Sequence, residues 1–104
     1  MASSLVKFAT YQLTPNQSVI KHWNNATPPW AVWYVQAIPL ESSFNGNPGV
    51  QSVEVEVTRV WRRLNQTPTG KDVEINKYEH EIWYELKNLS AKKVDVDVYA
   101  SIIS

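Results

Sequence analysis

Apolar and polar residues alternate with a period of two along most of this chain, in segments separated by clusters of proline, glycine and asparagine. Such alternation is typical of β-strands that bury one face, and no segment shows the 3.6-residue period of an amphipathic helix. The pattern therefore predicts an all-β chain, with strands at residues 5–13, 18–23, 31–38, 50–64, 75–88 and 94–103.

The breaks between these segments carry turn-forming residues. Residues 14–17, Thr-Pro-Asn-Gln, predict a turn because proline fixes φ at the second turn position and asparagine bonds its own backbone. Residues 24–29 form a second break, since their two adjacent prolines cannot donate to a strand ladder. Residues 41–49 and 67–72 are predicted to be loops.

The segment 50–64 is too long for an ordinary strand, and its alternation changes phase. Its first three valines after position 50 share one face, whereas Val60 and Leu64 fall on the other parity. A one-residue shift exchanges the two faces of a strand, so one extra residue must be inserted for all of them to face the core. We predict a β-bulge or bend at residues 57–59.

The last two segments alternate most regularly. The core face of segment 75–88 is predicted to carry Tyr78, His80, Ile82, Tyr84 and Leu86. Its outward face carries Lys77, Glu79, Glu81, Trp83, Glu85 and Lys87. In segment 94–103 the inward residues are Val94, Val96, Val98, Ala100 and Ile102, with Asp95, Asp97, Tyr99, Ser101 and Ile103 outward.

The connection of five residues between these two segments favours a hairpin, in which residues opposite each other must share a face. The register that meets this condition places Leu86 opposite Val96 on the inside. On the outside it places Trp83 opposite Tyr99, so that two aromatic rings would face each other on the surface.

The length of 104 residues corresponds to one domain, which buries roughly two thirds of the surface of its unfolded chain and so needs no disulfide or metal. Short strands with one apolar face each are expected to close as two sheets packed face to face. We predict a single β-sandwich domain over residues 1–104, of jelly-roll or immunoglobulin-like type with about six to eight strands. A small β-barrel is the alternative.

Composition argues against several classes of function. Ten acidic and ten basic side chains balance to zero net charge, which argues against the basic surface that nucleic-acid binding requires. The absence of cysteine excludes a disulfide framework, a thiolate metal site and a cysteine nucleophile. The chain shows neither a secretory signal nor the run of ~18 apolar residues that a transmembrane segment needs. The expected location is cytoplasmic, or outside the cell after release without a signal peptide.

Patterns for catalysis and metal binding are weak. One of only two histidines, His80, lies on the predicted core face, where a general base is not expected. Carboxylate pairs such as Glu79 and Glu81 occur on almost any polar strand. Asp95 and Asp97 offer too few oxygens for calcium, and no glycine-rich phosphate motif is present. We expect no enzymatic activity, no cofactor and no metal.

Asn-x-Ser/Thr triplets occur four times, beginning at Asn16, Asn25, Asn65 and Asn88. Their glycosylation would require a secretory route, whereas asparagine, serine and threonine also favour turns through local hydrogen bonds. We interpret the triplets as turn chemistry.

Tryptophan is unusually frequent, with five residues in so short a chain. Trp33 lies in a segment that is apolar on both faces and is predicted to be buried. Trp23 ends a segment and could lie in the core or on the surface. Trp30 follows two prolines, which would hold its ring at the surface, and Trp83 falls on the charged face of its segment.

The outward parity after the predicted bulge includes Arg59, Trp61 and Arg63. If the two long segments pair as a hairpin, Arg59 falls near Glu79, and Trp61 near Lys77. The candidate ligand-binding or interface residues are Trp61, Trp83, Tyr99, Arg59, Arg63, Glu79, Glu81 and Trp30.

Aromatic rings among planar polar groups suit a sugar, whose apolar face stacks on a ring while its hydroxyls pair with carboxylates and guanidinium groups. The same residues are enriched at protein interfaces. The leading hypothesis is a non-catalytic, lectin-like module. The alternative is a structural, self-assembling protein that buries this face between subunits, and a third is a toxin-like module that attaches to membranes through Trp30, Trp33 and Tyr34. The expected partner is therefore a glycan or another copy of the chain.

Overall fold

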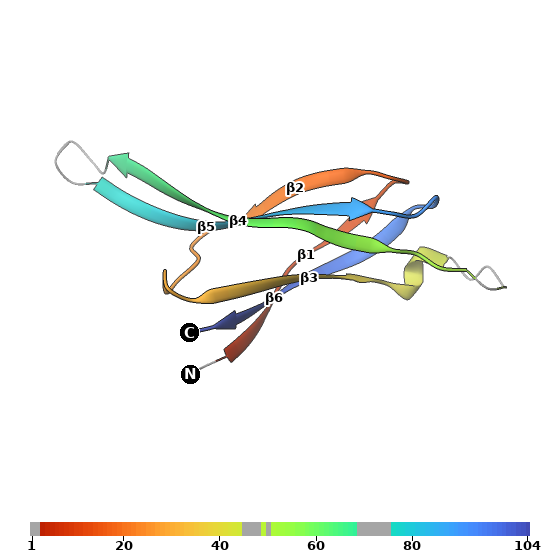
Figure 1. Ribbon diagram of the computed structural model, residues 1–104, viewed down its shortest axis with the longest axis horizontal. Helices are drawn as coiled ribbons and strands as arrows, with labels where there is room; N and C mark the ends of the chain where they lie inside the picture. Colours follow the sequence, from red (N-terminus) through yellow and green to blue (C-terminus); the bar gives the residue numbers. More distant parts are fainter. Residues whose placement is uncertain (1–2, 45–48, 50, 69–75) are drawn as a thin grey trace.

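A computed structural model describes residues 3–44, 49, 51–68 and 76–104 (Figure 1). Within these residues the chain forms six strands and one short 3-10 turn, η1, at Glu41–Phe44. The strands are β1 (Ser3–Leu13), β2 (Ser18–Trp23), β3 (Val32–Pro39), β4 (Val55–Pro68), β5 (Asn76–Asn88) and β6 (Val94–Ile103). The alternating pattern therefore predicted each strand, with bounds that differ by a few residues.

The strands form two antiparallel sheets of three strands each, which pack against each other as two layers (Figure 1). Sheet A has the order β1-β6-β3, and sheet B has the order β2-β5-β4. The prediction of an all-β sandwich is confirmed.

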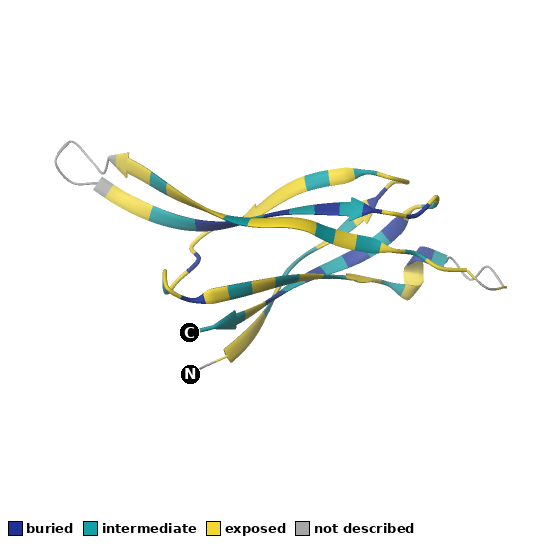
Figure 2. Ribbon diagram, viewed as in Figure 1, coloured by how far each residue is buried: buried dark blue, intermediate teal, exposed yellow. Residues whose placement is uncertain are grey.

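The core lies between the two sheets, where burial alternates along the strands (Figure 2). Its fully buried cluster consists of Leu13, Tyr84, Leu86, Val94, Val96 and Val98. Phe8 extends this core, because its ring stacks on Trp23 at 4.8 Å and on Tyr84 at 5.5 Å between ring centroids. Trp23 thus belongs to the core side. Trp33 faces the same way, 6.0 Å from Phe8, and its buried Nε1 has no hydrogen-bond partner among the described residues.

The predicted bulge is present in β4, where the pairing with β5 shifts register between Val57 and Arg59. Beyond the bulge, Val60 pairs with Tyr84, so it has the inward parity that the sequence predicted. It is nevertheless exposed, and so is Leu64 farther along the strand. The parity was correct, but sheet A does not cover this part of β4.

Val60 lies on the edge strand β4 beside Tyr84, whereas Leu64 lies farther along, on an arm of two strands. β2 reaches only as far along β5 as the pair Trp23 and Ile82, whereas β4 and β5 stay paired as far as Pro68 and Asn76. The arm projects beyond the sandwich at the left of Figure 1. His80, predicted on the core face, is half-buried at the base of this arm, where its carbonyl accepts a hydrogen bond from the Ala26 amide at 2.9 Å.

The predicted hairpin between the last two strands is wrong. β5 pairs with β2 and β4, whereas β6 pairs with β1 and β3, so the connection between them passes from one sheet to the other. Leu86 and Val96 both face the core, but from opposite layers, and Trp83 and Tyr99 lie on opposite outer faces. The sequence pattern could not distinguish a hairpin of β5 and β6 from a crossing between the sheets, because both arrangements bury the same residues.

Asn88 fixes this crossing between the sheets. Its side-chain amide is fully buried and donates to the carbonyls of Leu13, Thr14 and Lys92 at 3.2, 3.0 and 2.8 Å. Its amide oxygen accepts a hydrogen bond from the Ser90 backbone at 2.8 Å. One side chain thus bonds four backbone groups around the crossing, with its two amide hydrogens shared among the three carbonyls.

The other predicted turns agree with the structure where it describes them. Gln17 donates its amide to the Thr14 carbonyl at 3.1 Å, and Asn16 and Asn25 adopt the left-handed conformation with φ of 60° and 57°. Three of the four Asn-x-Ser/Thr asparagines thus occupy turns or the crossing between the sheets, whereas Asn65 lies within β4. In the predicted loops, residues 45–48 and 69–72 lie outside the described residues.

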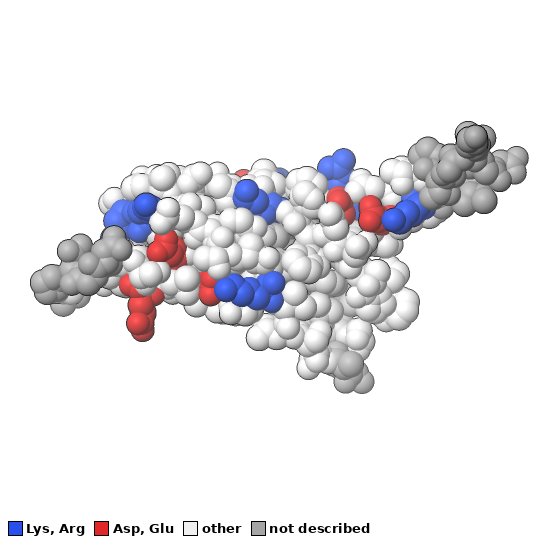
Figure 3. Space-filling view, turned by 180° about the vertical axis from the view of Figure 1, so that it is seen from behind, with Lys and Arg blue, Asp and Glu red and all other residues white. Residues whose placement is uncertain are grey.

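Charged side chains are unevenly spread over the surface. Figure 3 shows both signs along the length of the molecule, but the described surface at the end with the chain termini, at the lower right of that view, is uncharged. The described surface near the chain termini is therefore uncharged in this view.

Candidate functional site

The outer face of sheet B brings aromatic residues from all three of its strands into one row. His22 of β2 lies opposite Trp83 of β5, and Trp83 lies opposite Trp61 of β4. We call these three residues the aromatic row. They meet because each strand places its outward residue at the same level of the sheet.

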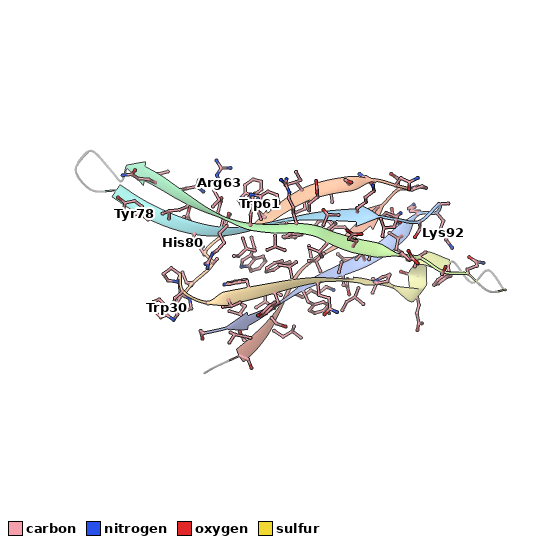
Figure 4. The ribbon with its side chains drawn as sticks, viewed as in Figure 1. Trp30, Trp61, Arg63, Tyr78, His80 and Lys92 are labelled. Carbon is pink, nitrogen blue, oxygen red and sulfur yellow. The ribbon has the colours of Figure 1, made fainter. Side chains whose placement is uncertain are left out.

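The rings of the aromatic row stand up from the sheet and stack on one another. Ring centroids of His22 and Trp83 lie 4.6 Å apart with an interplanar angle of 17°, and those of Trp83 and Trp61 lie 6.0 Å apart at 28°. An arginine guanidinium group lies over each tryptophan ring. The Cζ atom of Arg59 lies 4.2 Å from the Trp61 ring centre, and the Cζ atom of Arg63 lies 5.3 Å from the Trp83 ring centre. Figure 4 shows Trp61 and Arg63 projecting together from the outer side of this layer.

Glu81 is the buried carboxylate of this face, and a hydrogen bond holds it in place. The Trp83 Nε1 donates a hydrogen bond to the Glu81 Oε1 at 3.0 Å, and Glu81 is only 8% exposed. This hydrogen bond lowers the pKa of the Glu81 carboxyl, with further lowering from a hydrogen bond with Asn65 and from the positive charge of neighbouring groups, although burial opposes the shift. The group is thus a carboxylate at neutral pH, held beside the indole rings.

Polar partners extend on both sides of the aromatic row. Arg63 donates from Nε to the Asn65 side-chain oxygen at 3.0 Å, and the Thr58 hydroxyl donates to the Glu85 carboxylate at 2.6 Å. The face therefore offers guanidinium, carboxylate, amide, hydroxyl and imidazole groups around two indole rings.

The structure brings together six of the eight residues that the sequence singled out. The outer face of sheet B holds Arg59, Trp61, Arg63, Glu79, Glu81 and Trp83. Tyr99 lies on the outer face of sheet A, opposite Lys7 and Gln36. Trp30 lies in the segment before β3, below Tyr78 and His80 in Figure 4 and outside this face.

The predicted pairings within the face are wrong, although the face itself is right. Arg59 lies opposite Glu85 rather than near Glu79, and Trp61 lies opposite Trp83 rather than near Lys77. The turn was expected from residue 67 onward, but Thr67 still pairs with Lys77. Because β4 continues through Thr67 and Pro68, the register is displaced from the expected one.

Sequence reasoning missed His22 and Asn65 as members of this face. His22 has the outward parity of its strand, but the pairing of β2 with β5 spans about 60 residues of sequence and left no local signal. Asn65 was noted only as part of a triplet. Its position two residues after Arg63 on the same face was the available signal.

The aspartates of β6 are held by separate hydrogen bonds. Asp95 accepts from Ser42 at 2.7 Å and Gln12 at 3.0 Å, and Asp97 accepts from Thr10 at 2.6 Å and pairs with Lys7 at 3.4 Å. These bonds lower the pKa of both carboxyls. Among the described residues, no three histidine or carboxylate side chains gather as a possible metal site.

No protein-family model, curated protein or solved structure matches this chain. The only helical structure in the described ranges is the four-residue turn η1, and no helix there could cross a membrane. Function must therefore be inferred from the chemistry of the faces.

Proposed function

We propose that this protein is a non-catalytic carbohydrate-binding module that holds a sugar on the outer face of sheet B. The observation that carries the proposal is the direct pairing of Trp61 with Trp83, with Arg59, Arg63 and Glu81 in contact with these two rings. A pyranose needs an aromatic surface for its C–H groups and planar polar groups for its hydroxyls, and this face supplies both within one patch.

Trp61, half-buried on the edge strand β4, is the ring that we expect a sugar to contact. One face of its indole packs toward Trp83, and Arg59 lies over the ring at 4.2 Å. A cation–π contact at an exposed site contributes about 0.5 to 1 kcal/mol, so moving the Arg59 side chain aside costs little. A sugar that stacks on the uncovered indole offsets that cost through the apolar area it buries.

The polar neighbours then orient the sugar. Glu81 is ionised and rigid, so it accepts hydrogen bonds from hydroxyl groups, and Arg63 donates a planar pair of N–H groups. Asn65 both donates and accepts, which suits adjacent hydroxyls. Because these groups are already positioned by bonds to one another, ordering them on binding costs little conformational entropy.

The test is a glycan array followed by titration calorimetry with the strongest ligand. We expect wild-type protein to bind with an affinity in the range of single lectin sites, and Trp61→Ala to lose at least tenfold in affinity. The matched control is Tyr78→Ala, which removes an exposed ring from the inner side of the arm and should leave binding unchanged.

Two results would overturn the proposal. One is an array without saturable binding, and the other is equal loss of binding in Trp61→Ala and Tyr78→Ala. If instead Trp61→Ala splits a wild-type oligomer and no glycan binds, the face is a subunit interface, which is the competing function for the same residues.

A further inference from the structure

The outer face of sheet A carries a second group of exposed side chains, chemically unlike those of sheet B. Two successive rows of the sheet, one residue from each strand, form what we call the terminal face: Ser3, Ile103 and Val32, then Leu5, Ser101 and Tyr34. The buried residues of β6 point to the other side, so these six point outward.

Three of the four large side chains of the terminal face are strongly exposed, whereas Ile103 is half-buried. Leu5 is 68% exposed, Tyr34 61% and Val32 48%, and at the end of this sheet Trp30 is 75% exposed. Together these four present on the order of 500 Å² of mostly apolar surface, given that aromatic side chains bury 150–250 Å² each when covered. A patch of this size lies toward the upper end of what monomeric proteins expose, and such patches are often interaction sites.

The terminal face is also uncharged. None of its six residues has a titratable side chain that is charged at neutral pH. The nearest charge in the adjoining row is Lys7, whose ammonium group pairs with Asp97 of the same chain at 3.4 Å. Figure 3 shows this end of the molecule as an uncharged area.

We propose that the terminal face binds a second copy of this chain, in a two-fold symmetric dimer that packs sheet A against sheet A. Two-fold packing sets a surface against itself, so a charged face would oppose like charges, whereas an uncharged sheet face matches its own copy. Sheets pack face to face at about 10 Å in this way.

The area available suits this occupant. A standard interface buries about 800 Å² on each partner, and the apolar centre described above is of that order once its polar rim of Ser3, Ser101 and Gln36 is added. The rim supplies hydroxyl and amide groups, as interface rims commonly do. A lipid surface fits less well, because binding to anionic membranes relies on basic side chains that this face lacks.

Such a dimer leaves both outer faces of sheet B free and turned in opposite directions. Dimer formation does not depend on what those faces bind, because only the terminal face is buried in the dimer.

Sedimentation velocity over a concentration series tests the dimer. We expect the wild-type chain to reach twice its mass of 11.9 kDa at tens of micromolar or above. Tyr34→Lys and Ser101→Lys each place like charges across the two-fold interface, so both should sediment as monomers with unchanged circular dichroism. The control is Ile20→Lys, which adds the same charge at an exposed position on the outer face of sheet B and should remain dimeric.

Three results would overturn the proposal. These are a wild-type monomer at several hundred micromolar, a dimer that survives both lysine variants, and a dimer that Ile20→Lys also disrupts. Co-sedimentation of monomeric wild type with phosphatidylcholine vesicles, lost in Tyr34→Lys, would assign the face to a membrane surface instead.

Discussion

Trp61 of β4 lies directly opposite Trp83 of β5, with 6.0 Å between their ring centroids, on the face of sheet B that points away from the core. The pair joins two strands on the outside while Val60 and Tyr84 join them on the inside. The same two rings thus serve the stability of the sheet and the recognition that we propose for its surface.

Replacing Trp83 by alanine should weaken the fold without abolishing it. The ring stacks on both His22 and Trp61, and an aromatic pair contributes about 0.5 to 1.5 kcal/mol, so we expect a loss of about 1 to 3 kcal/mol. Urea denaturation followed by circular dichroism measures this loss. Trp30→Ala is the matched control and should change the free energy of unfolding by less than ~0.5 kcal/mol, because its ring is exposed. Complete unfolding of Trp83→Ala would show that the ring is part of the core.

Asn88→Ala should be far more damaging than its polar character suggests. The change leaves four backbone groups at the crossing between the sheets without their partner, and each buried unsatisfied group costs about 1 to 3 kcal/mol. We expect a loss of more than about 3 kcal/mol in thermal or urea unfolding. Asn24→Ala, at an exposed position, should stay within ~0.5 kcal/mol of wild type. Similar stabilities for the two variants would contradict the role given to Asn88.

The assignment of inward residues is tested by charge in the core. Val96→Asp and Ile82→Asp each bury a carboxylate among apolar side chains, at a cost of several kcal/mol, and should prevent folding. Lys77→Asp makes the same side chain on the exposed arm and should fold normally. Normal far-ultraviolet spectra for both core variants would mean that the two layers are wrongly assigned.

Acid should destabilise the protein through the aspartates of β6. Hydrogen bonds from Thr10 and Ser42 lower the pKa of Asp97 and Asp95, so the folded state favours their ionised forms. A lowered pKa in the folded state gives stability above the ordinary aspartate range, and that stability is lost as pH falls through the folded-state pKa. Urea midpoints should therefore decline below about pH 4.

Thr10→Val separates this effect from general acid denaturation. The variant removes the hydroxyl that donates to Asp97, so it should be less stable than wild type at pH 7. The two proteins should converge in stability as pH falls through the folded-state pKa of Asp97, because the contribution of its ionised form is then lost in both. A constant difference at every pH would mean that the hydroxyl stabilises the fold in another way.

Local patterns predicted much of this fold. Period-two alternation gave the strands and their faces, and the change of phase around Thr58 gave the bulge, because burying one face fixes the parity of each residue. The same reasoning placed Arg59, Trp61 and Trp83 on one surface. These features depend on neighbours in sequence.

The pairing of distant strands could not be predicted in the same way. Leu86 and Val96 are buried equally well in a hairpin or across a sandwich, so burial did not choose between them. The choice depends on Asn88, whose side chain reaches backbone groups about 75 residues away. The place of His22 in the aromatic row could not be predicted for the same reason. It depends on the pairing of β2 with β5, which no local pattern specifies.

The binding face is tested most directly by nuclear magnetic resonance of isotope-labelled protein during titration with the strongest array ligand. We expect the largest backbone and indole shifts at residues 59–65 and 79–85, and small ones in β1, β3 and β6. Shifts confined to sheet A, or no saturable shifts with any saccharide bound on the array, would contradict carbohydrate recognition by the outer face of sheet B.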